Sequence, residues 1–159
     1  MTDDIYFMNE AIAEAELAAA ADEVPVGAVV VRDGKIIARA HNTRESDKNA
    51  LRHAETAAID AACRALGGWR LPGCTLYVTM EPCPMCAGAI LNARIGRVVY
   101  GAADLRAGAM GTVLNVNDVA YFQRAEVVGG VLGDECREML SAYFRGKREK
   151  QKEEKKGER

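Results

Sequence analysis

A histidine, a glutamate and two cysteines stand at spacings that suit metal chemistry. One residue separates His53 from Glu55, and Cys83 and Cys86 follow later in the chain with two residues between them. Cysteines at positions i and i+3 in the first turn of a helix share one face, and a helix N-terminus lowers the thiol pKa, which favours the thiolates that zinc requires. His53 would give a third ligand at the start of another helix and leave the fourth tetrahedral position for water. The sequence therefore predicts an open zinc site of the catalytic kind.

Glu55 is the group that an open zinc site needs in addition to its ligands. Zinc brings the pKa of a bound water to about 7, and a nearby carboxylate then has to carry the proton that the water loses. Taken alone, C-x-x-C also suits two buried thiols or a redox pair, and H-x-E is common on solvated helices. The two motifs together favour catalysis by a bound metal.

A closed structural zinc site is the alternative interpretation. Cys63, Cys74 or Cys136 would then supply the fourth ligand, and the protein would be a binding module. The chain is long enough to fold without a metal, and a structural site has no use for Glu55, so we favour the open site. Spare cysteines are typical of small apolar core residues, and His41 has no partner at ligand spacing.

The surrounding sequence predicts the helices and strands that must position these side chains. Asp3 and Asp4 suit the start of a first helix, and Asp33-Gly34 predicts a tight turn between two strands. Strands alternate with helices after this hairpin, which indicates an α/β fold whose mixed sheet has helices on both faces. The predicted helices cover residues 3–21, 53–66, 86–95 and 134–144, the last with room to continue, and the strands cover 26–31, 35–41, 74–80, 97–101 and 125–131.

Composition limits the class of protein. With 159 residues, 49% of them hydrophobic and 28% charged, the chain should form one globular domain, which excludes general disorder. Its N-terminus is acidic and has no basic segment, so it is neither a signal peptide nor a membrane span, and we expect a cytoplasmic location and no membrane partner. Five cysteines in a chain of this size indicate reduced thiols.

Charge is distributed unevenly along the chain. Residues 145–159 carry a net charge of +4, whereas the preceding residues carry −6. A basic tail on an acidic body can engage phosphates, and the alternative is a solvated helix end rich in Glu and Lys. We expect a domain over residues 1–148 followed by a charged tail over 149–159.

The sequence resembles the bacterial tRNA-specific adenosine deaminases of the cytidine deaminase-like superfamily. The zinc motif alone identifies only the superfamily, and the surrounding strings make the narrower assignment. The resemblance implies a three-layer α-β-α sandwich with a five-stranded mixed sheet. The matching strings are VPVGAVVV (24–31), HAE (53–55), LYVTMEPCPMCAGAI (76–90), RIGRVVYGAADLRAGAMGTV (94–113) and GDECREMLSAYFRGKR (133–148).

The resemblance also implies a reaction. His53, Cys83 and Cys86 match the residues that bind Zn²⁺ in this family, and Glu55 matches its general acid and base. Glu55 would take a proton from the zinc-bound water and deliver it to the adenine ring while hydroxide attacks C6. Ammonia would then leave, and adenosine at the wobble position of a tRNA would become inosine.

Further matches concern the substrate. Asn42 matches a residue that contacts the target nucleotide, Val26 and Ala54 match residues that line the base pocket, and Asp104 matches one near the substrate sugar. Their alternatives are a turn residue for Asn42, simple packing for Val26 and Ala54, and a loop residue for Asp104.

The C-terminal residues match a helix that contacts the anticodon arm of the tRNA. A stacking ring followed by cations is what reads single-stranded RNA loops, although Phe144 also suits a core position. These matching residues are Phe144, Arg145, Lys147 and Arg148. The family is also homodimeric. The alternative enzyme is a zinc-dependent deaminase of free bases or nucleosides, of guanine or cytosine type, which would gain nothing from the basic tail.

Overall fold

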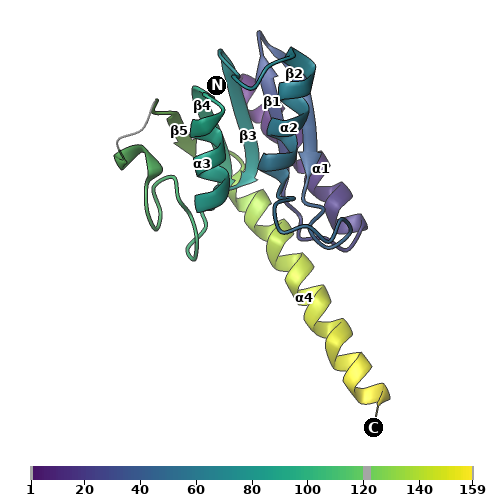
Figure 1. Cartoon of the computed structure of the whole chain (residues 1–159). Helices are drawn as coiled ribbons and strands as arrows, with labels where there is room; N and C mark the ends of the chain where they lie inside the picture. Colours follow the sequence, from purple (N-terminus) through teal and green to yellow (C-terminus); the bar gives the residue numbers. More distant parts are fainter. Residues whose placement is uncertain (1, 120–122, 159) are drawn as a thin grey trace.

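A five-stranded sheet with helices on both faces forms the body of the protein (Figure 1). This computed structural model describes residues 2–119 and 123–158, so Arg159 of the predicted tail lies outside the described residues. The elements in chain order are α1 (Thr2–Ala20), β1 (Gly27–Arg32), β2 (Lys35–His41), α2 (Ala54–Leu66), β3 (Cys74–Met80), α3 (Pro84–Asn92), β4 (Arg97–Ala102), the 3₁₀ turn η1 (Val116–Asp118), β5 (Glu126–Gly129) and α4 (Gly133–Gly157).

The sheet is mixed, as the sequence predicted. Its strand order is β2-β1-β3-β4-β5, with β1 antiparallel to both neighbours and β3, β4 and β5 mutually parallel. Asp33 and Gly34 join β1 to β2 with φ angles of 52° and 73°. Two consecutive positive φ angles match the right-handed twist of the flanking strands, and this explains why a glycine stands at the second position.

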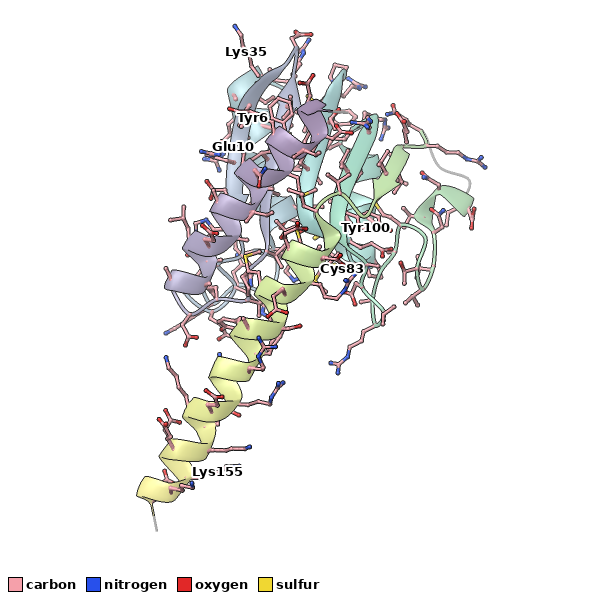
Figure 2. All side chains as sticks on the ribbon, turned by 180° about the vertical axis from the view of Figure 1, so that it is seen from behind. Tyr6, Glu10, Lys35, Cys83, Tyr100 and Lys155 are labelled. Carbon is pink, nitrogen blue, oxygen red and sulfur yellow. The ribbon has the colours of Figure 1, made fainter. Side chains whose placement is uncertain are left out.

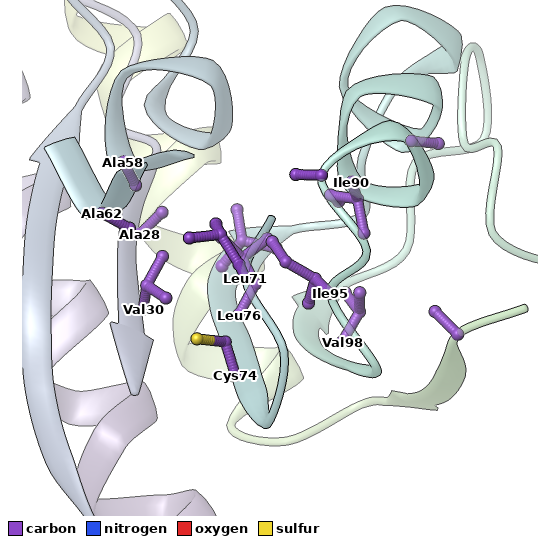
Figure 3. Packing of buried hydrophobic residues seen from close by; sticks show 14 of the residues in the cluster. Ala28, Val30, Ala58, Ala62, Leu71, Cys74, Leu76, Ile90, Ile95 and Val98 are labelled. Atoms are coloured by element: carbon purple, nitrogen blue, oxygen red, sulfur yellow. The ribbon is translucent and has the colours of Figure 1, made fainter. Parts of the chain in front are cut away.

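Alternation along the strands divides the core between two layers. Ala28 and Val30 of β1 face a cluster that includes α2 and α3, whereas Val29 and Val31 face a second cluster that includes α1. Figure 3 shows the first cluster, in which Leu76 of β3 points from the sheet toward the layer formed by α2 and α3. Figure 2 shows α1 and α4 over the opposite face. The three-layer α-β-α arrangement is therefore confirmed.

Both ends of α3 and the start of α2 differ from the prediction. α3 begins at Pro84 instead of Cys86, because proline fits the first turn, where its missing N–H costs no hydrogen bond. It ends at Asn92, and Arg94 then adopts a left-handed φ of 65°, which no helix continues. α2 begins one residue later than predicted, so that His53 is its N-cap.

The last two elements also differ in length from the prediction. β5 is shorter than predicted because Gly130 has a φ of 87°, which lies outside the range of an extended strand. α4 continues to Gly157 and extends well beyond the body of the protein (Figure 1). Within the described residues, no helix has both the length and the apolar character that crossing a bilayer requires.

Asp4 anchors the start of α1 to the sheet, and this contact predicts an acid-sensitive part of the stability. Its carboxylate accepts hydrogen bonds from both terminal nitrogens of Arg97 at 2.8 Å and from the Tyr77 hydroxyl at 2.6 Å. The bonds from Arg97 are the main reason why the pKa of Asp4 falls from 3.8 to about 2. The carboxylate therefore stabilises the fold fully above pH 3.8, and this stabilisation is lost as the pH falls toward 2.

We expect Asp4→Asn to lower the free energy of unfolding at pH 7 by on the order of 1–2 kcal/mol, after allowance for solvent screening. Urea unfolding of both proteins across a pH series would measure it. The two free energies should converge in acid, because the wild-type carboxyl then becomes neutral as well. A difference that stays the same from pH 7 to pH 2 would contradict this explanation.

Candidate metal centre

Two helix N-termini bring the predicted metal ligands together. His53 is the N-cap of α2 and Cys83 is the N-cap of α3, and both have extended backbone angles. α2 and α3 cover the same face of the sheet, so the loop after β2 and the end of β3 deliver the two caps to one place (Figure 1). Cys86 lies one turn into α3 and is fully buried.

The distances between the three ligand atoms suit zinc. His53 Nδ1 lies 3.7 Å from Cys83 Sγ and 3.4 Å from Cys86 Sγ. A nitrogen at ~2.0 Å and a sulfur at ~2.3 Å from a tetrahedral ion are about 3.5 Å apart, so both distances fit shared coordination. One imidazole and two thiols are also the donor types that zinc prefers. The residues present therefore fit the expected ion.

The two thiols differ in their affinity for protons. The hydrogen bond from Cys86, helped by a second one with His53, lowers the pKa of Cys83 to about 4. The same hydrogen bond to Cys83, together with burial, raises the pKa of Cys86. The hydrogen bond with Cys83 raises the pKa of His53. The site thus already favours one thiolate, which is the form that binds a metal.

Glu55 lies beside the ligands in the first turn of α2, and its side chain is buried. Only 4% of the residue is exposed, and this burial raises the pKa of the carboxyl group to about 7. A carboxyl group that titrates near neutral pH can both accept and donate a proton under working conditions.

Two of the predicted ligands, His53 and Cys83, border a cavity of about 150 Å³. Pockets that enclose whole drug-sized ligands usually measure ~300–1,000 Å³, so this cavity suits a single flat ring system. The residues that line it are Val24, Val26, Asn42, Arg44, His53, Ala54, Glu55, Met80, Glu81, Cys83 and Asp104. All four residues predicted to contact the base, nucleotide or sugar are among them, and Cys86 lies behind the wall.

Asn42 is held firmly at the cavity. It is 7% exposed, its amide nitrogen donates to the carbonyl of Val24 at 3.3 Å, and its Oδ1 accepts from the Arg44 N–H at 3.2 Å. Asp104 has a similar local bond, since its Oδ1 accepts from the N–H groups of Arg106 and Ala107. Both residues therefore also shape their own loops, as the alternative interpretation of each predicted.

The predicted C-terminal residues lie on α4 and not at the cavity. Phe144 is 42% exposed, so it is not a core residue, and its ring meets that of Tyr143 edge-on. Arg145 pairs with Glu138 at 2.8 Å, and Lys147 lies 3.4 Å from the Tyr143 hydroxyl. Arg148 is exposed on the same helix.

Glu81 and Arg44 also line the cavity, and the sequence predicted no role for either residue. Glu81 is 2% exposed, and its carboxylate accepts from the N–H groups of Asp104, Met110 and Thr112, so it organises the loop after β4. A glutamate between a buried strand and Pro-Cys was the available signal. Arg44 had only its nearness to Asn42 as a signal.

The remaining cysteines lie elsewhere. Cys74 packs in the core beneath α2 and α3, Cys63 packs at its margin, and Cys136 is buried in the other layer. Among residues 2–119 and 123–158, the group with metal-binding geometry consists of His53, Cys83 and Cys86 alone. This arrangement agrees with an open site. His41 pairs with Glu14 at 2.8 Å.

Sequence comparisons relate the chain to known deaminases. The profile of the MafB19-like deaminase family matches residues 1–135. The tRNA-specific adenosine deaminase of Bacillus subtilis is 54% identical over 153 residues, which cover 96% of this chain and 95% of the relative.

Solved structures agree with the fold. A structure from a study of A-to-I editing by tRNA:A34 deaminases at the wobble position of transfer RNA superposes with a TM-score of 0.82 and 44% identity, over 84% of this chain and 98% of that one. The guanine deaminase from Nitrosomonas europaea superposes with a TM-score of 0.78 and 25% identity, over 87% and 83% of the two chains.

Proposed function

The chain belongs to the tRNA-specific adenosine deaminases, and from this membership we propose that it hydrolyses the wobble adenosine of a tRNA to inosine. The observation that carries the proposal is a buried carboxylate beside a three-ligand metal group, at the wall of a cavity that suits one base. The identity of 54% to a tRNA-specific adenosine deaminase over nearly the whole chain supports the choice of substrate.

His53, Cys83 and Cys86 hold Zn²⁺ in this proposal. When bound, zinc lowers the pKa of a water molecule to about 7 and so supplies a nucleophile at neutral pH. His53 and Cys83 would hold the ion at the cavity wall and Cys86 would hold it from behind, and the distances from His53 Nδ1 to the two sulfurs support this role.

Glu55 is the general acid and base. Its carboxylate takes the proton that the attacking water loses and then delivers it to the adenine ring, so one group serves both halves of the reaction. Its place in the first turn of α2, two residues after His53 and at the wall of the cavity, supports this role.

The cavity walls bind the nucleotide. Val26 and Ala54 contact the faces of the base, Asn42 hydrogen-bonds the target nucleotide, and Asp104 lies near the ribose, where a carboxylate can accept from a 2′-hydroxyl. A cavity of this size leaves the sugar and phosphates outside, and this suits an adenosine turned out of an anticodon loop, where little stacking has to be broken.

We propose that Phe144, Arg145, Lys147 and Arg148 on α4 bind the anticodon arm. Removal of all residues after Ala142 is expected to abolish deamination of an anticodon stem-loop, because a stacking ring and its neighbouring cations are lost together. Inosine formation, measured by mass spectrometry, is the readout. The truncated protein should keep its zinc, since the ligands lie on α2 and α3.

Removal of only residues 149–159 is the matched control, because it leaves the aromatic and basic residues in place. We expect this shorter truncation to keep most of the activity, in line with a domain that ends at residue 148. Unchanged turnover after removal of all residues beyond Ala142 would count against RNA as the substrate and favour the guanine or cytosine type of deaminase.

Homodimer formation and a cytoplasmic location complete the proposal. Support for a dimer comes from the segment between β4 and β5, where several large apolar side chains are exposed to solvent. They are Leu105, Val113, Leu114 and Val119. Exposed apolar side chains that lie close together are typical of protein–protein interfaces. Support for the location comes from the free cysteines and from the similarity to a tRNA-specific adenosine deaminase.

A further inference from the structure

Glu23 is a buried carboxylate whose function the reaction does not explain. It stands in the turn between α1 and β1, is 1% exposed, and does not line the cavity. Its two oxygens accept hydrogen bonds from the backbone N–H groups of Glu45 and Ser46, at 2.9 and 3.1 Å. Removing a carboxylate from water costs free energy, which these hydrogen bonds offset. A buried carboxylate in a turn therefore points to a role for the segment that it binds.

The segment that Glu23 holds is part of the active site. Residues 42–52, which we call the substrate loop, connect β2 to the α2 N-cap and carry Asn42 and Arg44, both of which line the cavity. Glu23 accepts from the two residues directly after Arg44. It therefore fixes the backbone of the substrate loop at the point where an exposed guanidinium group stands at the cavity mouth.

Asp22, the residue before Glu23, contacts α4, the helix that we propose to bind RNA. Both the backbone carbonyl and Oδ1 of Asp22 accept a hydrogen bond from the Tyr143 hydroxyl at 3.1 Å, and Lys147 Nζ lies 3.9 Å from Oδ1. Asp22 and Glu23 thus connect the substrate loop on one side with α4 on the other.

We propose that Glu23 is a positioning residue for RNA binding, which holds the substrate loop in register with α4 so that both contact one anticodon arm. The inference rests on the proposed function. Glu23 touches neither the base nor the metal ligands, so it acts through Asn42 and Arg44. Its loss should weaken binding of the RNA in the ground state and the transition state alike, which raises KM and leaves kcat nearly unchanged.

The test compares Glu23→Gln with the wild-type enzyme, both loaded with zinc, on an anticodon stem-loop. Glutamine keeps the size of the side chain but presents an NH₂ group to one of the two N–H donors. We expect KM to rise roughly tenfold and kcat to change less than about threefold, because hydrogen bonds to a charged group are among the stronger ones. Asp4→Asn is the matched control: it removes a carboxylate from the other end of α1 and should leave KM unchanged.

Ser46→Pro provides a second variant in case Glu23→Gln does not fold. It removes one of the two N–H donors and leaves the buried carboxylate in place, so it should also raise KM. Amide hydrogen exchange gives a readout that is independent of RNA. It is measured at Glu45 and Ser46 in the wild-type protein and at Glu45 in Ser46→Pro. Exchange should be slow in the wild type and faster in the variant.

Three results separate the possible failures. An unchanged KM in both variants, with an active wild-type enzyme, would overturn the inference alone. A fall in kcat with KM unchanged would also overturn it, because Glu23 would then serve the chemical step. A wild-type enzyme with slow exchange but no action on the stem-loop would overturn the proposed function, and the inference with it.

Discussion

Glu55→Gln is expected to lower kcat on an anticodon stem-loop by on the order of 10³-fold, while the protein keeps a full complement of zinc. General acid and base catalysis contributes ~10²–10⁴-fold to enzymatic rates, and glutamine can neither take nor deliver the proton. The variant should bind zinc normally because the metal group consists of His53, Cys83 and Cys86. Single-turnover kinetics and metal analysis on the same sample would measure both quantities.

Stability separates this variant from one that is merely misfolded. Burial disfavours the charged form of Glu55, so a neutral amide of nearly equal size should leave the unfolding temperature at or above that of the wild type. Glu16→Gln is the control, since it changes an exposed carboxylate on α1 and should retain full activity. If Glu55→Gln kept more than a tenth of the wild-type kcat, another residue would have to move the proton.

Cys86→Ala should remove both the metal and the activity. Two protein ligands hold zinc far more weakly than three, and thiolates provide the strongest of these bonds. We expect purified Cys86→Ala to contain little zinc and to form no detectable inosine. Metal content, measured by inductively coupled plasma mass spectrometry, gives the number of zinc ions per chain.

Cys136→Ala is a matched control for this substitution. Cys136 is as fully buried as Cys86 and also lies in the first turns of a helix, but it packs on the opposite face of the sheet. We expect Cys136→Ala to lose some stability through the small cavity it leaves and to keep one zinc per chain. Equal zinc content in the two variants would contradict the assignment of Cys86 as a ligand.

The site was largely predictable because its chemistry is local. H-x-E and P-C-x-x-C each place their residues at the start of a helix, and the i, i+3 spacing of the two cysteines indicates that their side chains share a face. The order of strands and helices after the hairpin predicted helices on both faces of the sheet, and the Asp33-Gly34 turn predicted the hairpin itself. The errors in α3 come from Pro84, which fits the first turn of the helix, and from Arg94, whose left-handed φ cannot be seen in the sequence.

The positioning residues were not predictable in the same way. Glu23 and Glu81 act through backbone N–H groups that lie more than twenty residues away in the chain. Every non-proline residue carries such a donor, so the partners leave no trace in the sequence. Only the fold reveals that two glutamates each hold a loop at the cavity.

The most direct test of the account is deamination of an anticodon stem-loop in water labelled with oxygen-18, followed by mass spectrometry of the product nucleoside. We predict inosine at the wobble position with one labelled oxygen, because hydrolysis places a solvent oxygen on C6. An unlabelled product would contradict hydrolysis by water. No inosine in the stem-loop, together with turnover of free guanine or cytosine, would contradict the assignment of tRNA as the substrate.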